Sequence, residues 1–294
     1  MVRTIREAHR WAFSFLQQNG GQSAEDARFI AERLLRHLLG WDRARFFAAL
    51  DEPFPEELWP ALRRLIEEKG QGMPLQYLVG SQEFYGREFR VSPHVLIPRP
   101  ETECLVESVL ERADTLWQTA APSVVDVGCG SGAIAVTLAK ERPSWDVTAI
   151  DLSKDALRTA RDNAARHKVE RRIRFLQGDL LIPLVEGKER VDIVVSNPPY
   201  IPTRDLETLA VEVREHEPRL ALDGGEDGLD VYRRLAAMLK DVVKRPKGIV
   251  ALEVGAGQSR EVASLLHQSL PHGKIDVVKD LAGIDRVVVL YWTC

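Results

Sequence analysis

From residue 123 onward, short runs of apolar, β-branched residues alternate with longer segments whose apolar residues recur at helical spacing. We predict strands at 123–127, 146–150, 172–177, 191–195, 247–253, 274–278 and 286–291. We predict helices at about 132–141, 154–167, 228–243 and 258–269. This alternation implies a mostly parallel sheet with right-handed crossovers. Because open α/β sheets bind ligands beyond the carboxyl ends of their strands, the residues that follow each strand are the candidates for a functional site.

The residues after the fourth predicted strand carry the most specific chemistry. Residues 196–200 read Ser-Asn-Pro-Pro-Tyr, and two consecutive prolines cannot continue a strand, so the chain leaves the sheet at Asn197. The uncharged amide of Asn197 both accepts and donates, whereas Pro198 and Pro199 present only carbonyl oxygens. Tyr200 adds a flat aromatic face. This combination suits a planar, neutral NH2 group, although a lone Asn-Pro-Pro is equally compatible with a turn around a buried Asn.

The first predicted strand leads into a glycine-rich turn. Residues 124–132 read Val-Val-Asp-Val-Gly-Cys-Gly-Ser-Gly and are followed by a helix. Glycines permit positive φ and let a ligand lie against bare backbone, while the helix start offers free N–H groups, which suits a nucleoside cofactor. The motif Gly128-x-Gly130-x-x-Ala133 also matches the relaxed dinucleotide-binding fingerprint. The turn alone therefore does not show whether the ligand is a nicotinamide cofactor or another adenosine-containing molecule. We expect Cys129, inside the turn, to be structural rather than nucleophilic.

The second and third predicted strands each lead to an acid. Asp151 follows the second strand, where its carboxylate can accept from both hydroxyls of a ribose. Asp179 follows the third strand, where it can accept from an adenine amino group while Leu180 lies against the ring. Either acid could instead cap a helix. A glycine turn and two acids at three successive strand ends form a stronger pattern than any one of them.

The first part of the chain has a different pattern. We divide the chain into a helical domain at 1–75, a hairpin linker at 76–100 and an α/β domain at 101–294. Ser23 and Gly40 have the sequence context of helix caps, and the helical domain contains no catalytic constellation. Aromatic runs broken by Gly86 predict the β-hairpin. Glu101 or Thr102 could simply cap the helix that follows, which we predict to extend to about Thr119.

Composition argues against several kinds of protein. The net charge of −4 and the isoelectric point near 6.0 disfavour a protein that coats nucleic acid by bulk electrostatic attraction, so no direct nucleic-acid binding is expected. Cys104, Cys129 and Cys294 are too few and too scattered for disulfides or a zinc site, so we expect no metal and a reducing compartment. No apolar signal core and no apolar run of roughly 18 residues is present, so we expect a cytoplasmic protein without a membrane partner.

The order of these features resembles a class I S-adenosylmethionine-dependent methyltransferase of the kind that methylates planar nitrogens. Nearly the whole chain resembles the HemK (PrmC) family. Besides the helical amino terminus and the hairpin, the resemblance rests on Ile-Pro-Arg-Pro-Glu-Thr-Glu at 97–103, Asp-Val-Gly-Cys-Gly-Ser-Gly-Ala-Ile-Ala at 126–135, Ser-Asn-Pro-Pro-Tyr-Ile at 196–201 and Glu-Pro-Arg-Leu-Ala-Leu at 217–222. Members of this family are protein-(glutamine-N5) methyltransferases that act on peptide chain release factors.

The resemblance implies a Rossmann-like, seven-stranded sheet whose last strand is antiparallel, beside a small helical domain that docks the substrate. It implies S-adenosylmethionine as donor, S-adenosylhomocysteine as product and the glutamine of a release-factor Gly-Gly-Gln loop as acceptor. The implied donor-site residues are Gly128, Cys129, Gly130, Ser131, Gly132, Asp151, Asp179, Leu180 and Asn197. The implied substrate-binding residues are Asn197, Pro198, Pro199 and Tyr200, with Asn197, Pro198 and Tyr200 acting on the reacting amide. Some relatives have an aromatic residue in place of Leu180, so we expect apolar packing rather than stacking there.

Three alternatives use part of the same pattern. A nucleic-acid methyltransferase acting on adenine N6 or guanine N2 would also hold a planar NH2 group, but the acidic balance and the lack of an obvious base-reading module disfavour it. A nicotinamide dehydrogenase would explain the glycine turn and Asp151 but not residues 197–200. A non-catalytic binding protein on the same scaffold is disfavoured because both halves of the site are intact.

Overall fold

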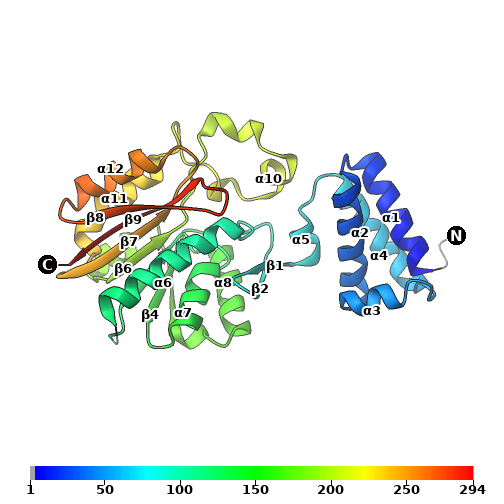
Figure 1. Ribbon diagram of the computed structural model, residues 1–294, viewed down its shortest axis with the longest axis horizontal. Coiled ribbons are helices and arrows are strands. Elements are labelled where there is room, and N and C mark those ends of the chain that lie inside the picture. Colours follow the sequence, from blue (N-terminus) through cyan, green and yellow to red (C-terminus); the bar gives the residue numbers. More distant parts are fainter. Residues whose placement is uncertain (1–3, 119, 294) are drawn as a thin grey trace. The chain divides into compact units, whose positions relative to one another are not determined.

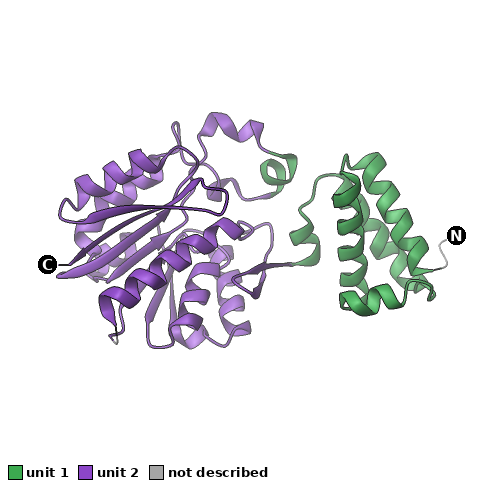
Figure 2. Cartoon of the chain, viewed as in Figure 1, with its two compact units in different colours: residues 1–80, 210–216 green, residues 81–209, 217–294 purple. Residues whose placement is uncertain are grey.

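The computed structural model describes residues 4–118 and 120–293, so Cys294 lies outside the described residues. The chain forms two compact units (Figure 2). The first unit extends to Gly80 and also contains residues 210–216, and the second contains residues 81–209 and the chain from Glu217 onward. Within the described residues, no helix is both long and apolar enough to cross a membrane.

The first unit is helical, as its apolar periodicity and capping residues predict. Its elements are α1 (Ile5–Asn19), α2 (Ala24–Leu39), α3 (Arg43–Ala48), the 3-10 turn η1 (Glu56–Leu58), α4 (Trp59–Gly70), α5 (Leu75–Val79) and α10 (Val211–His216). The Ser23 hydroxyl accepts from the N–H of Asp26 at the start of α2, and Gly40 ends that helix with a φ of 66°. The apolar faces of α1, α2 and α4 close on one buried cluster.

Helix α10 joins the first unit through a contact between distant parts of the chain. Lys69 of α4 is 2% exposed, and its ammonium pairs with the carboxylate of Glu212 in α10, 143 positions later. Lys69 also donates to the carbonyl of Met73 at 3.2 Å. Because a buried ammonium is costly without an opposite charge, this pair accounts for the position of a helix too short to be recognised by its periodicity.

The second unit begins with the predicted hairpin. Its first elements are β1 (Ser81–Phe84), β2 (Arg87–Arg90), the 3-10 turn η2 (Pro100–Thr102) and α6 (Glu103–Trp117). The two strands pair antiparallel, and Phe84 and Phe89 are fully buried. The Glu103 carboxylate accepts from the N–H of Tyr85 at 2.8 Å, which fixes the hairpin turn to the start of α6. Thr119, the expected end of this helix, lies outside the described residues.

The second unit is built on a seven-stranded sheet, as the alternation predicts (Figure 1). Its strands are β3 (Ser123–Val127), β4 (Asp146–Asp151), β5 (Ile173–Gln177), β6 (Ile193–Ser196), β7 (Lys247–Glu253), β8 (Lys274–Lys279) and β9 (Asp285–Thr293). The order across the sheet is β5-β4-β3-β6-β7-β9-β8, and β9 runs antiparallel to both neighbours. The predicted fold class, a mostly parallel sheet with an antiparallel last strand, is confirmed.

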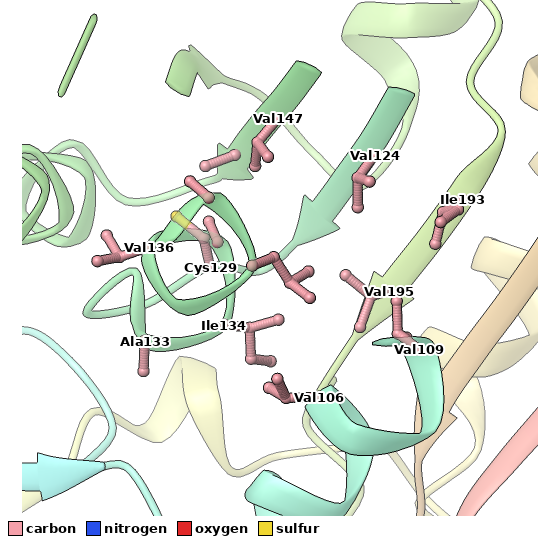
Figure 3. Close-up of a cluster of buried hydrophobic side chains, with 14 of the residues drawn as sticks. Val106, Val109, Val124, Cys129, Ala133, Ile134, Val136, Val147, Ile193 and Val195 are labelled. Carbon is pink, nitrogen blue, oxygen red and sulfur yellow. The ribbon is translucent and has the colours of Figure 1, made fainter. Parts of the chain in front are cut away.

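Helices cover both faces of this sheet. The remaining elements are α7 (Ala133–Glu141), α8 (Lys154–Arg166), η3 (Glu170–Arg172), α9 (Ile182–Gly187), η4 (Thr203–Thr208), η5 (Arg219–Ala221), α11 (Asp230–Val242) and α12 (Ser259–Ser269). The helices α6, α7 and α8 pack on one face, and α9, α11 and α12 pack on the other. Figure 3 shows Val124 and Val195 of the sheet facing Val106 of α6 and Ile134 of α7. The sheet is therefore buried between two layers of helices.

Candidate functional site

A cavity of about 240 Å³ lies in the second unit, at the carboxyl edge of strands β3 to β6. The predicted site residues that line it are Gly128, Cys129, Gly130, Ser131, Asp151, Asp179, Leu180, Asn197 and Pro199. Gly132, Pro198 and Tyr200 are not among the residues that line it. Segments 94–102 and 218–221 and the side of α11 complete the wall. The structure therefore brings both halves of the predicted site to one cavity.

The glycine turn is held against the neighbouring strand by its own backbone. The N–H groups of Gly128 and Cys129 both donate to the carbonyl of Ile150, at 2.8 and 3.0 Å. Gly128 and Gly130 have φ angles of 71° and 54°, and a Cβ on either would meet no atom within 4 Å. The turn therefore presents bare backbone to open space, which is the fit that a nucleoside ligand needs.

Two other members of the turn serve packing. A Cβ on Gly132 would lie 3.0 Å from the Cβ of Ala160, so this glycine allows α7 to approach α8. Cys129 is buried, and burial raises the pKa of its thiol. A protonated thiol is a poor nucleophile, which agrees with the structural role expected for Cys129.

Asp151 connects the glycine turn to the end of β4. Its Oδ2 accepts from the N–H of Gly130 and its Oδ1 accepts from the N–H of Ser153, each at 2.8 Å. Burial raises the pKa of Asp151, and these backbone hydrogen bonds oppose that rise. Ser153 caps α8 by accepting from Ala156, so Asp151 is not the cap. Because each carboxylate oxygen has a further lone pair, Asp151 can also accept from hydroxyl groups in the cavity.

Asp179 lies beside Arg234 of α11, with 2.5 Å between its Oδ2 and the guanidinium Nη2. Both residues line the cavity. The Asp179 carboxylate, which we expected to accept from an adenine amino group, therefore also pairs with the guanidinium of Arg234. The sequence did not point to Arg234 as its partner. Helix α9 has Leu181 at its N-cap and no capping side chain, so the interpretation of Asp179 as a cap is wrong. Leu180 has a φ of 52° and packs against the apolar cluster under α11.

Asn197 is held from its amide nitrogen. The strand register brings Gly128, Asn197 and Glu253 to the same level of the sheet edge, because the residues that precede them are partners across β3, β6 and β7. Asn197 Nδ2 donates to Thr102 Oγ1 at 3.2 Å. Thr102 occupies the N-cap position of α6, but it is buried and its side chain makes no capping bond. Thr102 instead supports a residue that lines the cavity.

The main chain of the Asn-Pro-Pro-Tyr loop is clamped by a second turn. Gln258 Nε2 donates to the carbonyls of Tyr200 and Gly228, at 2.9 and 3.4 Å, and its Oε1 accepts from the N–H of Gly255 at 3.0 Å. A Cβ on Gly228 would lie 2.4 Å from the Tyr200 carbonyl oxygen. The Tyr200 ring is half-buried against the apolar cluster on the α11 face. Burial raises the pKa of its hydroxyl.

Several residues around the cavity were not selected from the sequence. They are Arg99, Glu217, Arg234, Glu253 and Gln258. The guanidinium of Arg99 bonds to the carboxylate of Glu217, which joins the segments on two sides of the cavity. Both residues lie within motifs on which the family resemblance rests, so the motifs contained a signal for them. Glu253 had only the weaker signal of an acid at a strand end, and nothing in the sequence points to Gln258.

Two known families match the chain. The PrmC N-terminal domain matches residues 7–80, and the Methyltransferase small domain matches residues 102–225. A release factor glutamine methyltransferase from Bacillus anthracis is 43% identical over 284 residues, which are 97% of this chain and 98% of that protein. One from Geobacter sulfurreducens is 44% identical over 290 residues, 98% of this chain and 96% of that protein.

Among solved structures, a methyltransferase from Pyrococcus furiosus shares the fold, with a TM-score of 0.50 and 16% identity, over 72% of this chain and 91% of that one. The sheet order, the glycine turn and the cavity at the carboxyl edge define a class I methyltransferase. The chain belongs to the PrmC (HemK) family of release factor glutamine methyltransferases. It is therefore an enzyme, as the sequence predicted.

Proposed function

We propose that this protein transfers a methyl group from S-adenosylmethionine to the side-chain amide nitrogen of the glutamine in the Gly-Gly-Gln loop of a peptide chain release factor, and thereby modulates translation termination in the cytoplasm. The observation that supports this best is the placement of Asn197, an uncharged carboxamide held by its nitrogen on the wall of a glycine-turn cavity. Relatives that match nearly the full chain carry the name of this activity.

The cavity residues fit such a donor. The open space beside Gly128 and Gly130 accommodates a ligand against the backbone, and Asp151 has lone pairs for ribose hydroxyls. Asp179 offers an acceptor for the adenine amino group, and Leu180 offers an apolar contact for the ring. S-adenosylmethionine, when bound, supplies an electrophilic methyl group.

The protein's own task is to prepare the acceptor. A glutamine side-chain nitrogen is a poor nucleophile because its lone pair is delocalised into the carbonyl. In our proposal, Asn197 Oδ1 accepts one amide hydrogen and a proline carbonyl accepts the other, which raises electron density on the nitrogen. The family resemblance implies Pro198 for the second role, whereas Pro199 is the proline that lines the cavity. As the N–C bond forms, the methyl group would leave the donor sulfur and one amide proton would be released to solvent. Holding the amide nitrogen about 3 to 3.5 Å from the methyl carbon would supply much of the rate.

Mass spectrometry of a release factor incubated with enzyme and S-adenosylmethionine tests the proposal. We expect a single added methyl group on the loop glutamine, and none when that glutamine is replaced by alanine. Single-stranded DNA and RNA oligonucleotides serve as alternative acceptors in parallel reactions. Methylation of an oligonucleotide, with no methylation of the release factor, would contradict the proposal.

We also infer that the first unit helps to dock the intact release factor. It carries two large exposed aromatic side chains, Phe29 and Phe47, which are 54% and 50% exposed. Exposed aromatic side chains are common contributors to protein interfaces. A role in docking would explain why the chain has a helical unit in addition to the unit that contains the cavity.

A further inference from the structure

We propose that Glu253 is a positioning residue that, together with Thr102, sets which end of the Asn197 carboxamide faces the substrate. The inference rests on the proposed function, because it takes Asn197 Oδ1 as the acceptor for the glutamine amide. Glu253 is not among the residues that line the cavity, whereas Thr102 and Asn197 are. Glu253 would therefore act only through these neighbours.

The three side chains come from separate segments and meet behind the cavity wall. Glu253 ends β7 and is 1% exposed, and Thr102 precedes α6 and is 5% exposed. The Glu253 carboxylate lies close enough to the Thr102 and Asn197 side chains for both to lower its pKa as hydrogen-bonding neighbours. Thr102 Oγ1 in turn accepts from Asn197 Nδ2 at 3.2 Å. Behind the cavity wall, Asn197 is thus bonded to Thr102 and lies beside the buried carboxylate of Glu253.

The ionised carboxylate of Glu253 would determine which groups donate and which accept among Glu253, Thr102 and Asn197. It can only accept, so the Thr102 hydroxyl donates to Glu253 and its oxygen is left to accept from Asn197. Both partners of Asn197 on the buried side are then acceptors, and they bind its NH2 end. Shape alone cannot make this choice, because the oxygen and nitrogen of a carboxamide are nearly the same size. The reversed amide would present donors to a substrate that also presents donors.

The charge of Glu253 is sensitive to pH. Burial raises the pKa of Glu253 to about 7, and the negative charge of Glu101 adds to the rise. Hydrogen bonds from Thr102 and Asn197, and the positive charge of Arg286 on β9, act in the opposite direction. Because the pKa is raised, Glu253 becomes neutral as the pH falls through about 7, and the direction of the hydrogen bonds is no longer imposed.

The other groups near Glu253 do not supply a replacement charge. Tyr232 of α11 donates its hydroxyl to the Glu253 main-chain carbonyl at 2.7 Å, and burial raises the pKa of this hydroxyl and that of Tyr200. Burial also raises the pKa of the Cys104 thiol on α6, so it stays neutral. Glu253 Oε2 is buried and has no hydrogen-bonding partner within the described residues, so it can take a proton without breaking a bond.

Steady-state methylation of a release factor, measured from acid to alkaline pH, tests the inference. At alkaline pH we expect Glu253→Gln to lower kcat about 10- to 100-fold while the KM for S-adenosylmethionine changes little. The wild-type kcat should fall below about pH 7, and Glu253→Gln should lack this fall. Glu141→Gln, at the far end of α7 and paired with Arg87, is the matched control and should keep the fall.

A second pair of variants separates positioning from general loss of structure. Thr102→Val keeps the shape but removes the hydroxyl, and it should lower kcat as Glu253→Gln does. Thr102→Ser restores the hydroxyl and should restore most of kcat. If Glu253→Gln keeps both the wild-type kcat and the acid fall, or if Thr102→Ser is no better than Thr102→Val, the inference is wrong.

The same experiment distinguishes this inference from the proposed function. If the wild-type enzyme does not methylate the release-factor glutamine, the proposed function fails and the inference fails with it. If the wild type is active and Asn197→Ala abolishes turnover while Glu253→Gln has no effect at any pH, only the role of Glu253 is refuted.

Discussion

The donor half and the acceptor half of the cavity are built in different ways. In the donor half, main-chain hydrogen bonds between β3 and β4 fix the glycine turn, and Asp151 ties the two ends together. In the acceptor half, side chains from three distant segments meet: Thr102, Asn197 and Glu253. A site formed by the main chain depends on the local backbone conformation. A site formed by interacting side chains can lose its function when a single polar atom is replaced. Substitutions in the two halves should therefore have different kinetic consequences.

The largest effect is expected for Asn197→Ala. This substitution removes the acceptor that orients the substrate amide but leaves the glycine turn intact. We expect kcat to fall about 10²- to 10³-fold, as when one oriented hydrogen-bonding group is removed from another active site. The dissociation constant for S-adenosylmethionine, measured by calorimetry, should change much less. A variant with wild-type turnover would remove Asn197 from the mechanism.

The same contrast explains what the sequence could predict. The glycine turn and Asp151 each follow a strand that is recognisable in the sequence by its run of apolar residues. The local sequence pattern was therefore enough to predict that they lie at the same edge of the sheet. The partnership of Thr102 with Asn197 spans 95 positions and depends on how α6 packs on the sheet. Thr102 at a helix start is indistinguishable in sequence from a cap. Short helices such as α9 and α10 were missed because six residues do not display a period.

A change in the donor half should affect binding before turnover. Asp151→Ala removes an acceptor proposed for ribose and also the partner of the Gly130 N–H. We expect the dissociation constant for S-adenosylmethionine to rise about 10- to 100-fold by calorimetry. Asp179→Ala is the matched comparison, and its effect should be smaller because Asp179 is more exposed and already paired with Arg234. An unchanged constant for Asp151→Ala would contradict the ribose assignment.

The clamp on the acceptor loop predicts a loss of stability. Gly228→Ala would place a Cβ 2.4 Å from the Tyr200 carbonyl oxygen and would strain a φ of 79°. We expect it to lower the free energy of unfolding by about 1 to 3 kcal/mol in chemical denaturation. Gly257→Ala shares the positive φ, at 84°, but its Cβ would meet no atom within 4 Å, so it isolates the backbone strain. Equal losses in the two variants would show that the Tyr200 contact is unimportant.

The smallest effect concerns substrate recognition outside the cavity. If the acceptor half recognised the substrate alone, the helices of residues 4–80 would be dispensable. Deleting those residues, however, would also remove Lys69, the partner of Glu212 in α10. Phe29→Ala avoids this problem because Phe29 is exposed. We expect it to lower kcat/KM for an intact release factor about two- to fivefold and to leave a Gly-Gly-Gln peptide unaffected. Val277→Ala, at an exposed position on β8, is the control. Equal losses on protein and peptide would place the effect of Phe29 on the catalytic unit and refute docking.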